Sequence, residues 1–291
     1  MTEKPDYDRL WDLIKNTRFC MCVQIQQADG QLRSRPLTTQ NQSLDEGILY
    51  FFIPKDGDIA QNLQQDRRIN LAYANVDKAE TEDKDLCRRL NVDATQYLFD
   101  FSQAKKAQFI YISTDYVFVG QESFYDEDGK PNPLNVYGKT KYEGEKVVQD
   151  NGMIVRISFP YRAQFEKKKD FVRTLKWLME QGKELKMVTD SLNTPTFIDD
   201  IAHSLKYLIN NFSPEVFHLN GSDSFTPYEE ALQIARIFSL DSNLVGKTTF
   251  DEFYKGKAAR PRNTVMKSKK NTFHTMKGFE EGLISIKESL K

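Results

Sequence analysis

The feature that most constrains the fold is an alternation of helical segments with short apolar strands, which begins near residue 75. The helical segments KDLCRRLNVDATQYLFDFSQ and YGKTKYEGEKVVQD precede the apolar runs QFIYIS and MIVRIS, and EVFHLNG follows a third helical segment, IDDIAHSLKYLINNF. Strands that are apolar on both faces need cover on both faces, and alternating helices supply this cover in parallel sheets. The sequence therefore predicts an α/β domain with a parallel sheet over residues 75–291.

Residues 1–74 follow a different pattern. Apolar residues at helical spacing predict one amphipathic helix over residues 5–16. The runs FCMCVQIQQ, LRSRPLTTQ, GILYFFIP and INLAYA then predict strands, with a hairpin turn at ADGQ and a helix at DIAQNLQQDR. We therefore expect a separate β-rich module with a boundary near residue 74.

The composition argues against several classes of partner. The chain has 41 Lys and Arg against 42 Asp and Glu, a formal net charge of −1, so its overall charge does not attract nucleic acid or an anionic membrane. No apolar run approaches the roughly 20 residues of a membrane span, and the polar start MTEKPDYDRL does not resemble a signal peptide. We expect a cytoplasmic protein with neither nucleic acid nor membrane as a partner.

The cysteines and histidines predict no metal site. Cys20, Cys22 and Cys87 do not have the spacing of zinc ligands, and the first two fall on one face of a predicted strand, where packed thiols are the expected state. The three histidines are spread along the chain in unrelated local settings. We therefore expect no bound metal.

The segment NVYGKTKYEGE places Tyr137 four residues before Lys141 at the start of a predicted helix. Helical residues at this spacing share a face, so both side chains can point into one site. A phenol has a reference pKa of about 10, and a nearby ammonium is expected to lower this value. Tyr137 could then pass a proton to a carbonyl oxygen, although the same spacing also occurs through ordinary helix packing.

Two hydroxyl side chains lie at the end of a neighbouring predicted strand. In QFIYISTDYVFVG, Ser113 and Thr114 come just past the apolar run, at the carboxyl end where open α/β sheets bind their ligands. A hydroxyl there can polarise a substrate carbonyl. The alternative is that Ser113 and Thr114 only cap a turn.

Together these motifs resemble a known family. The segments VDKAE, YISTDYVFVG, PLNVYGKTKYEGE, TPTFIDDIA and ARPRNTVM are similar to the extended short-chain dehydrogenase/reductases, in the dTDP-4-dehydrorhamnose reductase branch. The resemblance implies that Tyr137 is the catalytic acid and that Lys141 orients it and holds the nicotinamide ribose. It also implies that Thr114, with Ser113 beside it, polarises the keto group.

The resemblance further implies a nucleotide-sugar pocket and NADPH as the coenzyme, with dTDP-L-rhamnose as the product. The implied fold is a truncated Rossmann-like parallel sheet with a small substrate domain, whose segments fall near residues 160–200 and 222–291. Phe159 stands where the family often has tryptophan. The implied substrate-binding residues are Asp115, Tyr116, Phe118, Asn135, Phe159 and Arg260.

One part of such a reductase is missing from the sequence. The family begins with a glycine-rich turn that receives the coenzyme pyrophosphate, because only glycine allows so close a backbone approach. None of the 14 glycines completes a GxGxxG or GxxGxxG pattern, and the first recognisable family segment is NVDKAE. We therefore expect the coenzyme to keep only its nicotinamide contacts, through Tyr137 and Lys141.

The N-terminal module resembles the pyridoxamine-5'-phosphate-oxidase-like split barrels that bind flavin mononucleotide (FMN). The segment RSRPL, which comprises Arg33, Ser34, Arg35, Pro36 and Leu37, is similar to the strand that contacts the flavin and its phosphate. The later strands of the barrel are absent from the sequence, so closure would require a second chain, as in a homodimer, or another sheet. The run INLAYA fits both families, which suggests a fusion at a shared strand.

Four interpretations follow from the sequence. The first is an NADPH-dependent reductase of a 4-keto sugar nucleotide. The second is a regulatory or binding protein that holds a nucleotide sugar without reducing it, and the third is an FMN-dependent oxidoreductase that uses the N-terminal module. The fourth is a fusion without activity.

Overall fold

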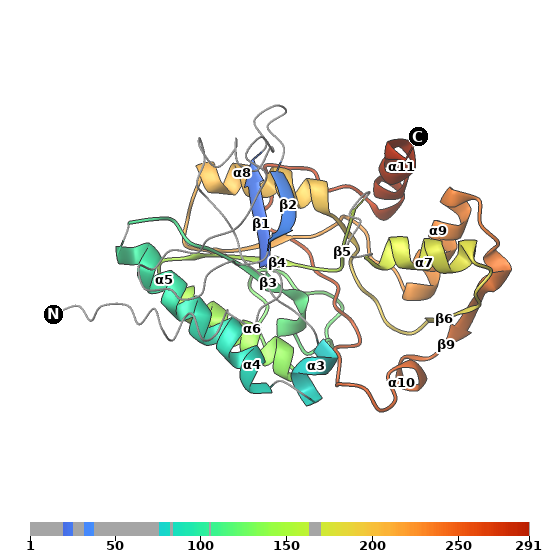
Figure 1. Cartoon of the computed structure of the whole chain (residues 1–291), viewed down its shortest axis with the longest axis horizontal. Coiled ribbons are helices and arrows are strands. Elements are labelled where there is room, and N and C mark those ends of the chain that lie inside the picture. Colours follow the sequence, from blue (N-terminus) through green and yellow to red (C-terminus); the bar gives the residue numbers. More distant parts are fainter. Residues whose placement is uncertain are drawn as a thin grey trace.

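The computed structural model describes residues 20–25, 32–37, 76–81, 84–104, 106–162 and 170–290 (Figure 1). The strands are β1 Cys20–Ile25, β2 Leu32–Leu37, β3 Ile110–Thr114, β4 Met153–Ile157, β5 Pro160–Tyr161, β6 Leu185–Val188, β7 Thr196–Phe197, β8 Val216–Leu219 and β9 Val245–Thr248. The α-helices are α3 Val76–Thr81, α4 Lys84–Arg88, α5 Ala94–Ala104, α6 Val136–Val148, α7 Phe171–Glu180, α8 Ile198–Asn210, α9 Pro227–Phe238, α10 Phe250–Phe253 and α11 Phe279–Ser289. A π-helical turn, Arg89–Asp93, joins α4 to α5, and 3-10 turns cover Asp115–Val117 and Ser242–Leu244.

The central sheet has the strand order β3-β4-β8, and both pairings are parallel. The apolar runs expected to form buried strands thus lie side by side. On one face, Tyr111 and Ile154 pack with Phe99 of α5 and Val148 of α6. On the other face, buried residues of β4 and β8 pack against α8. This arrangement confirms the predicted α/β class with a parallel sheet.

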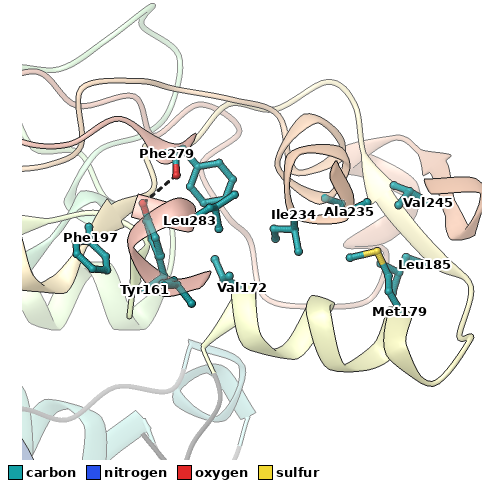
Figure 2. Close-up of a cluster of buried hydrophobic side chains, with 12 residues drawn as sticks. Tyr161, Val172, Met179, Leu185, Phe197, Ile234, Ala235, Val245, Phe279 and Leu283 are labelled. Carbon is teal, nitrogen blue, oxygen red and sulfur yellow. Dashed lines mark hydrogen bonds between the residues drawn. The ribbon is translucent and has the colours of Figure 1, made fainter. Parts of the chain in front are cut away.

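A second core lies in the lobe that contains α7, α9, α11, β6 and β9, which we call the ligand lobe (Figure 1). Strands β6 and β9 pair in parallel, and α7 and α9 pack together. Figure 2 shows Val172, Ile234 and Leu283 in this core, with the Tyr161 hydroxyl donating to the Phe279 carbonyl oxygen at 3.5 Å. The core therefore joins segments from before and after α8.

Of the N-terminal module, the structure describes β1 and β2, which pair in antiparallel register with Cys20 opposite Leu37. Strand β2 lies against α8 (Figure 1). The residues proposed to contact FMN fall on the β2 backbone, and their side chains are outside the described part of the chain. The helix expected at residues 5–16 and the strands expected between 47 and 74 also lie outside the described residues.

Candidate active site

The start of α6 is held in place by Asn135, the residue just before the helix. Its side-chain oxygen accepts a hydrogen bond from the Gly138 amide (2.7 Å), and its amide nitrogen donates to the Ala259 carbonyl oxygen (2.8 Å). A Cβ at Gly138 would lie 2.2 Å from the Tyr116 carbonyl oxygen, so only glycine allows this approach. Asn135 was expected to line the pocket, but in the structure it positions the first turn of α6.

Thr114 ends β3 and begins the turn that carries Asp115 and Tyr116. Its hydroxyl donates to Asp115 Oδ1 (2.9 Å) and accepts from the Tyr116 amide (3.3 Å). The turn-capping interpretation is therefore correct for Thr114. The same hydroxyl also hydrogen-bonds Tyr137, which acts to lower the pKa of that phenol, so capping and contact with Tyr137 occur together.

Asp115 is buried under the end of β3. It receives hydrogen bonds from Thr114 and, at 2.9 Å, from Ser158. Burial nevertheless raises the pKa of the Asp115 carboxyl, because desolvation outweighs these bonds. Asp115 thus fixes the orientation of the Thr114 hydroxyl by accepting its hydrogen bond.

Tyr137 lies beside Tyr116, with ring centroids 5.8 Å apart in an edge-to-face arrangement. Desolvation raises the pKa of Tyr137, against the effect of Thr114. The sequence-based expectation that Lys141 lowers this pKa is wrong for the structure described here. Desolvation of the phenol is the dominant cause, and the Lys141 ammonium donates to the Ile112 carbonyl oxygen.

The Lys141 Nζ donates to the Ile112 carbonyl oxygen at 2.6 Å and lies 4.1 Å from the centre of the Tyr111 ring. Burial lowers the pKa of Lys141 to about 8, because removal from water disfavours the charged form. The predicted pair therefore does share one helix, but the lysine contacts the backbone of β3.

Two further groups lie near this pair. The Ser113 hydroxyl is buried and has no hydrogen-bond partner among the described residues. Cys87 of α4 was considered in the sequence only as a metal ligand, yet its thiol lies 3.3 Å from Thr140 Oγ1 and acts on the pKa values of both Tyr137 and Lys141. No sequence signal connects Cys87 with α6, because the contact joins helices that are distant in the chain.

A cavity of about 310 Å³ borders the turn after β3. Three of the predicted substrate-binding residues line it, namely Tyr116, Phe159 and Arg260. The sequence reasoning did not identify the other walls, which come from α7, α9, α10, β6 and the segments next to them. Their aromatic and charged side chains are Asp170, Phe171, Lys186, Glu230, Phe250, Phe253, Tyr254 and Arg262.

Phe159 is held in an unusual backbone conformation, with a φ of 43°. Large side chains rarely occupy this left-handed region, and such residues concentrate at functional sites. The Thr196 amide donates to the Phe159 carbonyl oxygen at 3.1 Å, and the ring lies 4.4 Å from that of Phe171. This conformation places an aromatic wall on the cavity, as expected from the sequence.

Two arginines at the cavity are fixed by acidic partners and aromatic rings. Arg260 pairs with Asp77 of α3 at 2.7 Å and lies 4.7 Å from the centre of the Tyr254 ring. Arg262 pairs with Asp190 and Asp251 and lies 4.8 Å from the Phe250 ring centre. Each guanidinium group beside the cavity therefore already has an acidic partner and a ring contact.

Phe118 lies away from the cavity. It is fully buried, stacks on Tyr125 with ring centroids 4.2 Å apart, and receives the Arg156 guanidinium at 5.1 Å. Phe118 therefore supports the site from the core, in contrast to the sequence-based expectation that it lines the pocket.

The described residues fit one end of NADPH. Tyr137, Lys141 and the unpartnered Ser113 hydroxyl supply polar groups at the carboxyl end of β3, where a nicotinamide and its ribose could bind. For the pyrophosphate, the sequence offers no GxGxxG turn. The fit is therefore to the nicotinamide half.

Two general features of the described residues concern partners. None of the helices in this part of the chain has both the length and the apolar composition needed to cross a membrane. Among the same residues, no three His, Cys, Asp or Glu side chains are grouped so that they could hold a metal ion.

Two family models match the chain. The RmlD substrate binding domain matches residues 58–289, and the family described as pyridoxamine 5'-phosphate oxidase like matches residues 5–81. The two matches share residues 58–81, which include the run INLAYA. This overlap coincides with the strand that resembled both families in the sequence.

Individual proteins are similar to this chain over much of its length. The methionine adenosyltransferase 2 subunit beta of Bos taurus is 34% identical over 251 residues, which are 81% of this chain and 71% of that protein. The dTDP-4-dehydrorhamnose reductase of Salmonella typhimurium is 33% identical over 183 residues, 59% of each protein. The crystal structure of dTDP-4-dehydrorhamnose reductase from Bacillus anthracis in complex with NADP is 31% identical, with a TM-score of 0.70, and the match covers 80% of this chain and 84% of that one. The fold is thus Rossmann-like.

Proposed function

Because this chain belongs to the family of the RmlD substrate binding domain, we propose that it binds a nucleotide sugar and reduces its 4-keto group with NADPH. The substrate class is that of the similar dTDP-4-dehydrorhamnose reductases, and the product would be a deoxysugar nucleotide such as dTDP-L-rhamnose. One observation carries the proposal. The side chains of Thr114 and Tyr137 meet at the carboxyl end of β3, beside a cavity lined by Tyr116.

Tyr137 supplies the proton of the reaction. When bound, NADPH would supply the hydride for the carbonyl carbon. The oxygen then gains charge and takes up a proton, and a phenol with a raised pKa is present in the protonated form at neutral pH. Tyr116 and Thr114 hold this phenol in place through ring contact and a hydrogen bond.

Thr114 can polarise the substrate carbonyl only if its hydroxyl turns. Its proton is directed at Asp115 Oδ1 in this structure, so substrate binding must redirect it. Asp115 keeps its hydrogen bond from Ser158 when this happens, which limits the cost of the change. To Lys141, which donates to the Ile112 carbonyl oxygen, we assign the role of holding the nicotinamide ribose.

The ligand lobe supplies side chains that can bind a nucleoside diphosphate. Guanidinium groups form strong, often bidentate hydrogen bonds with phosphates, and Arg260 and Arg262 lie beside the cavity. Phe250 of α10 and Tyr254, just after this helix, lie next to them and offer surfaces on which a base or sugar can pack. We assign the phosphates to the arginines and the reacting sugar to the end at Tyr116.

The test is NADPH consumption in the presence of dTDP-4-dehydrorhamnose. We expect turnover by the wild-type chain and a loss of about 10²–10⁴-fold in Tyr137→Phe, the range typical of a lost general acid. Tyr207→Phe is the matched control, since Tyr207 is an exposed tyrosine of α8 that stacks on Phe273. Equal activity of Tyr137→Phe and Tyr207→Phe would contradict the proposal.

A second candidate function is nucleotide-sugar binding without reduction, as part of a regulatory protein. Two observations favour it. The sequence contains no GxGxxG turn, and one similar protein is named as a subunit of methionine adenosyltransferase 2. Calorimetric binding of dTDP-L-rhamnose together with an absence of NADPH consumption would support this function over the first.

FMN binding by the N-terminal module stays a prediction based on the match to residues 5–81. A flavin absorption band in the purified protein, lost in an Arg33→Ala, Arg35→Ala variant, would support it. The homodimer expected from barrel closure can be checked in the same sample by its mass in solution. A colourless protein that takes up no added FMN would contradict the prediction.

A further inference from the structure

Glu230, on the inner side of α9, is a buried acid in the wall of the cavity. Only 1% of the residue is exposed. With the Asn193 amide nitrogen oriented toward it, Asn193 donates to Glu230 Oε1 and, at 3.1 Å, to the Phe225 carbonyl oxygen. Within the described part of the chain, no lysine or arginine forms an ion pair with Glu230.

Burial of a carboxyl in this position lowers the stability of the folded chain. Burial raises the pKa of Glu230 well above its usual range, and the single bond from Asn193 opposes this only in part. Burial thus favours the neutral form of this acid, in which it carries one O–H donor beside the oxygen that accepts from Asn193. An apolar residue would fill the same place without this cost.

The chain segment that carries Asn193 connects this acid with Asp115 at the other end of the cavity wall. Its neighbour Leu192 pairs with the segment that contains Thr264, whose amide donates to the Leu192 carbonyl oxygen at 2.8 Å. The Thr264 side chain in turn hydrogen-bonds Asp115, the anchor of Thr114. Glu230 and Asn193 thus belong to the wall that runs toward the reacting hydroxyls.

We propose that Glu230 and Asn193 form a recognition pair for a hydroxyl group on the sugar of the bound nucleotide sugar, which sets the choice of sugar. This inference rests on the proposed function. The cavity lining combines this carboxyl and amide, which can bind hydroxyls, with the rings of Phe159 and Phe171, which can pack against the carbon face of a sugar ring. The phosphate-binding arginines are not needed for this contact.

The experiment is calorimetric titration of dTDP-L-rhamnose and of dTDP alone into the full-length chain. In Glu230→Leu we expect dTDP-L-rhamnose to bind at least about tenfold more weakly, while the affinity for dTDP stays within about twofold. Glu230→Gln resembles the protonated acid in shape and carries both a donor and an acceptor, so it should retain most of the affinity for the sugar nucleotide. Glu184→Leu, an exposed acid of the same lobe, is the matched control.

Thermal unfolding separates a recognition role from a structural one. If the acid serves the ligand, Glu230→Leu unfolds at the wild-type temperature or higher, because it removes a buried polar group. A clearly lower unfolding temperature would show a structural role and overturn the inference. Equal losses for dTDP and dTDP-L-rhamnose, or no loss for either, would also overturn it.

The same titrations distinguish this inference from the proposed function. A wild-type chain that binds neither dTDP nor dTDP-L-rhamnose contradicts the proposed function and the inference together. A wild-type chain that binds both, with Glu230→Leu unchanged, contradicts only the role of Glu230.

Discussion

The proposed reacting end of the molecule, at β3 and α6, is built differently from the ligand lobe. At the reacting end, Thr114, Tyr137 and Lys141 come from two short segments. Backbone groups bond the side chains of Thr114 and Lys141, while Tyr116 and Thr114 contact Tyr137. In the lobe, the cavity wall is assembled from many elements, and its charged groups are held by side-chain partners near the surface. The difference teaches that chemistry can be encoded in short motifs, whereas ligand choice depends on long-range packing.

Ion pairs give the largest expected contrast between the two regions. Behind the reacting end, Arg156 binds both Glu145 oxygens at 2.9 and 2.7 Å, and both side chains are buried. Arg156→Met leaves the Glu145 carboxylate buried without a cation, and we expect the free energy of unfolding to fall by about 3–5 kcal/mol. Urea denaturation measures this change.

The control for Arg156 lies in the lobe. Arg236 of α9 pairs with Glu280 at the surface, where both side chains are about half exposed, and Arg236→Met should lower the free energy of unfolding far less than Arg156→Met does. Similar losses of unfolding free energy in the two variants would contradict the contrast between a buried ion pair behind the reacting end and an exposed one on the lobe.

The second prediction concerns pH and Lys141. The folded-state pKa of about 8 lies below the unfolded value of 10.5, so the unfolded chain binds more protons between these pH values. Stability contributed by this group therefore rises as the pH increases from 8 to 10.5, with a slope of up to about 1.4 kcal/mol per pH unit. Urea denaturation across this range should show that Lys141→Met loses the rise.

Lys139→Met provides the comparison, since Lys139 is exposed on the same helix. The difference between the two variants isolates the buried ammonium from all other groups that titrate in this range. If both variants keep the wild-type slope, Lys141 is not desolvated as described.

The third and smallest effect concerns the lobe. Arg260→Ala removes a guanidinium that lies beside the cavity, and the loss of charged hydrogen bonds should weaken dTDP binding by about 1.5–3 kcal/mol, or roughly ten- to a hundredfold. Calorimetry measures this loss, and Arg236→Ala serves as a control away from the cavity. An unchanged dTDP affinity in Arg260→Ala would contradict the assignment of the phosphates to Arg260.

The sequence predicted the reacting end better than the lobe, for physical reasons. Buried parallel strands have uniformly apolar runs, so the segments QFIYIS, MIVRIS and VFHL predict β3, β4 and β8 from local sequence. The helix that carries Tyr137 and Lys141 was likewise visible from its local spacing. Local patterns suffice where a function depends on residues close together in the chain.

The remaining features depend on contacts that no local pattern contains. Phe118 lies in a motif but is buried in the core, and Lys141 has its acceptor on β3. Desolvation raises the pKa of Tyr137, where the spacing alone suggested a lowered value. The cavity groups Glu230 and Asn193 are far apart in sequence and meet only through tertiary packing. The spacing of residues along the sequence does not predict where a side chain points or how far it is removed from water.

The central claim is that hydride from NADPH reaches the sugar at this site while Tyr137 supplies the proton. The most direct measurement uses NADPH that carries deuterium on its transferable position, with dTDP-4-dehydrorhamnose as substrate and mass spectrometry of the sugar product. The account predicts deuterium bound to the carbon of the former keto group with the wild-type chain, and almost none with Tyr137→Phe. A sugar without deuterium after incubation with the wild-type chain would contradict the account.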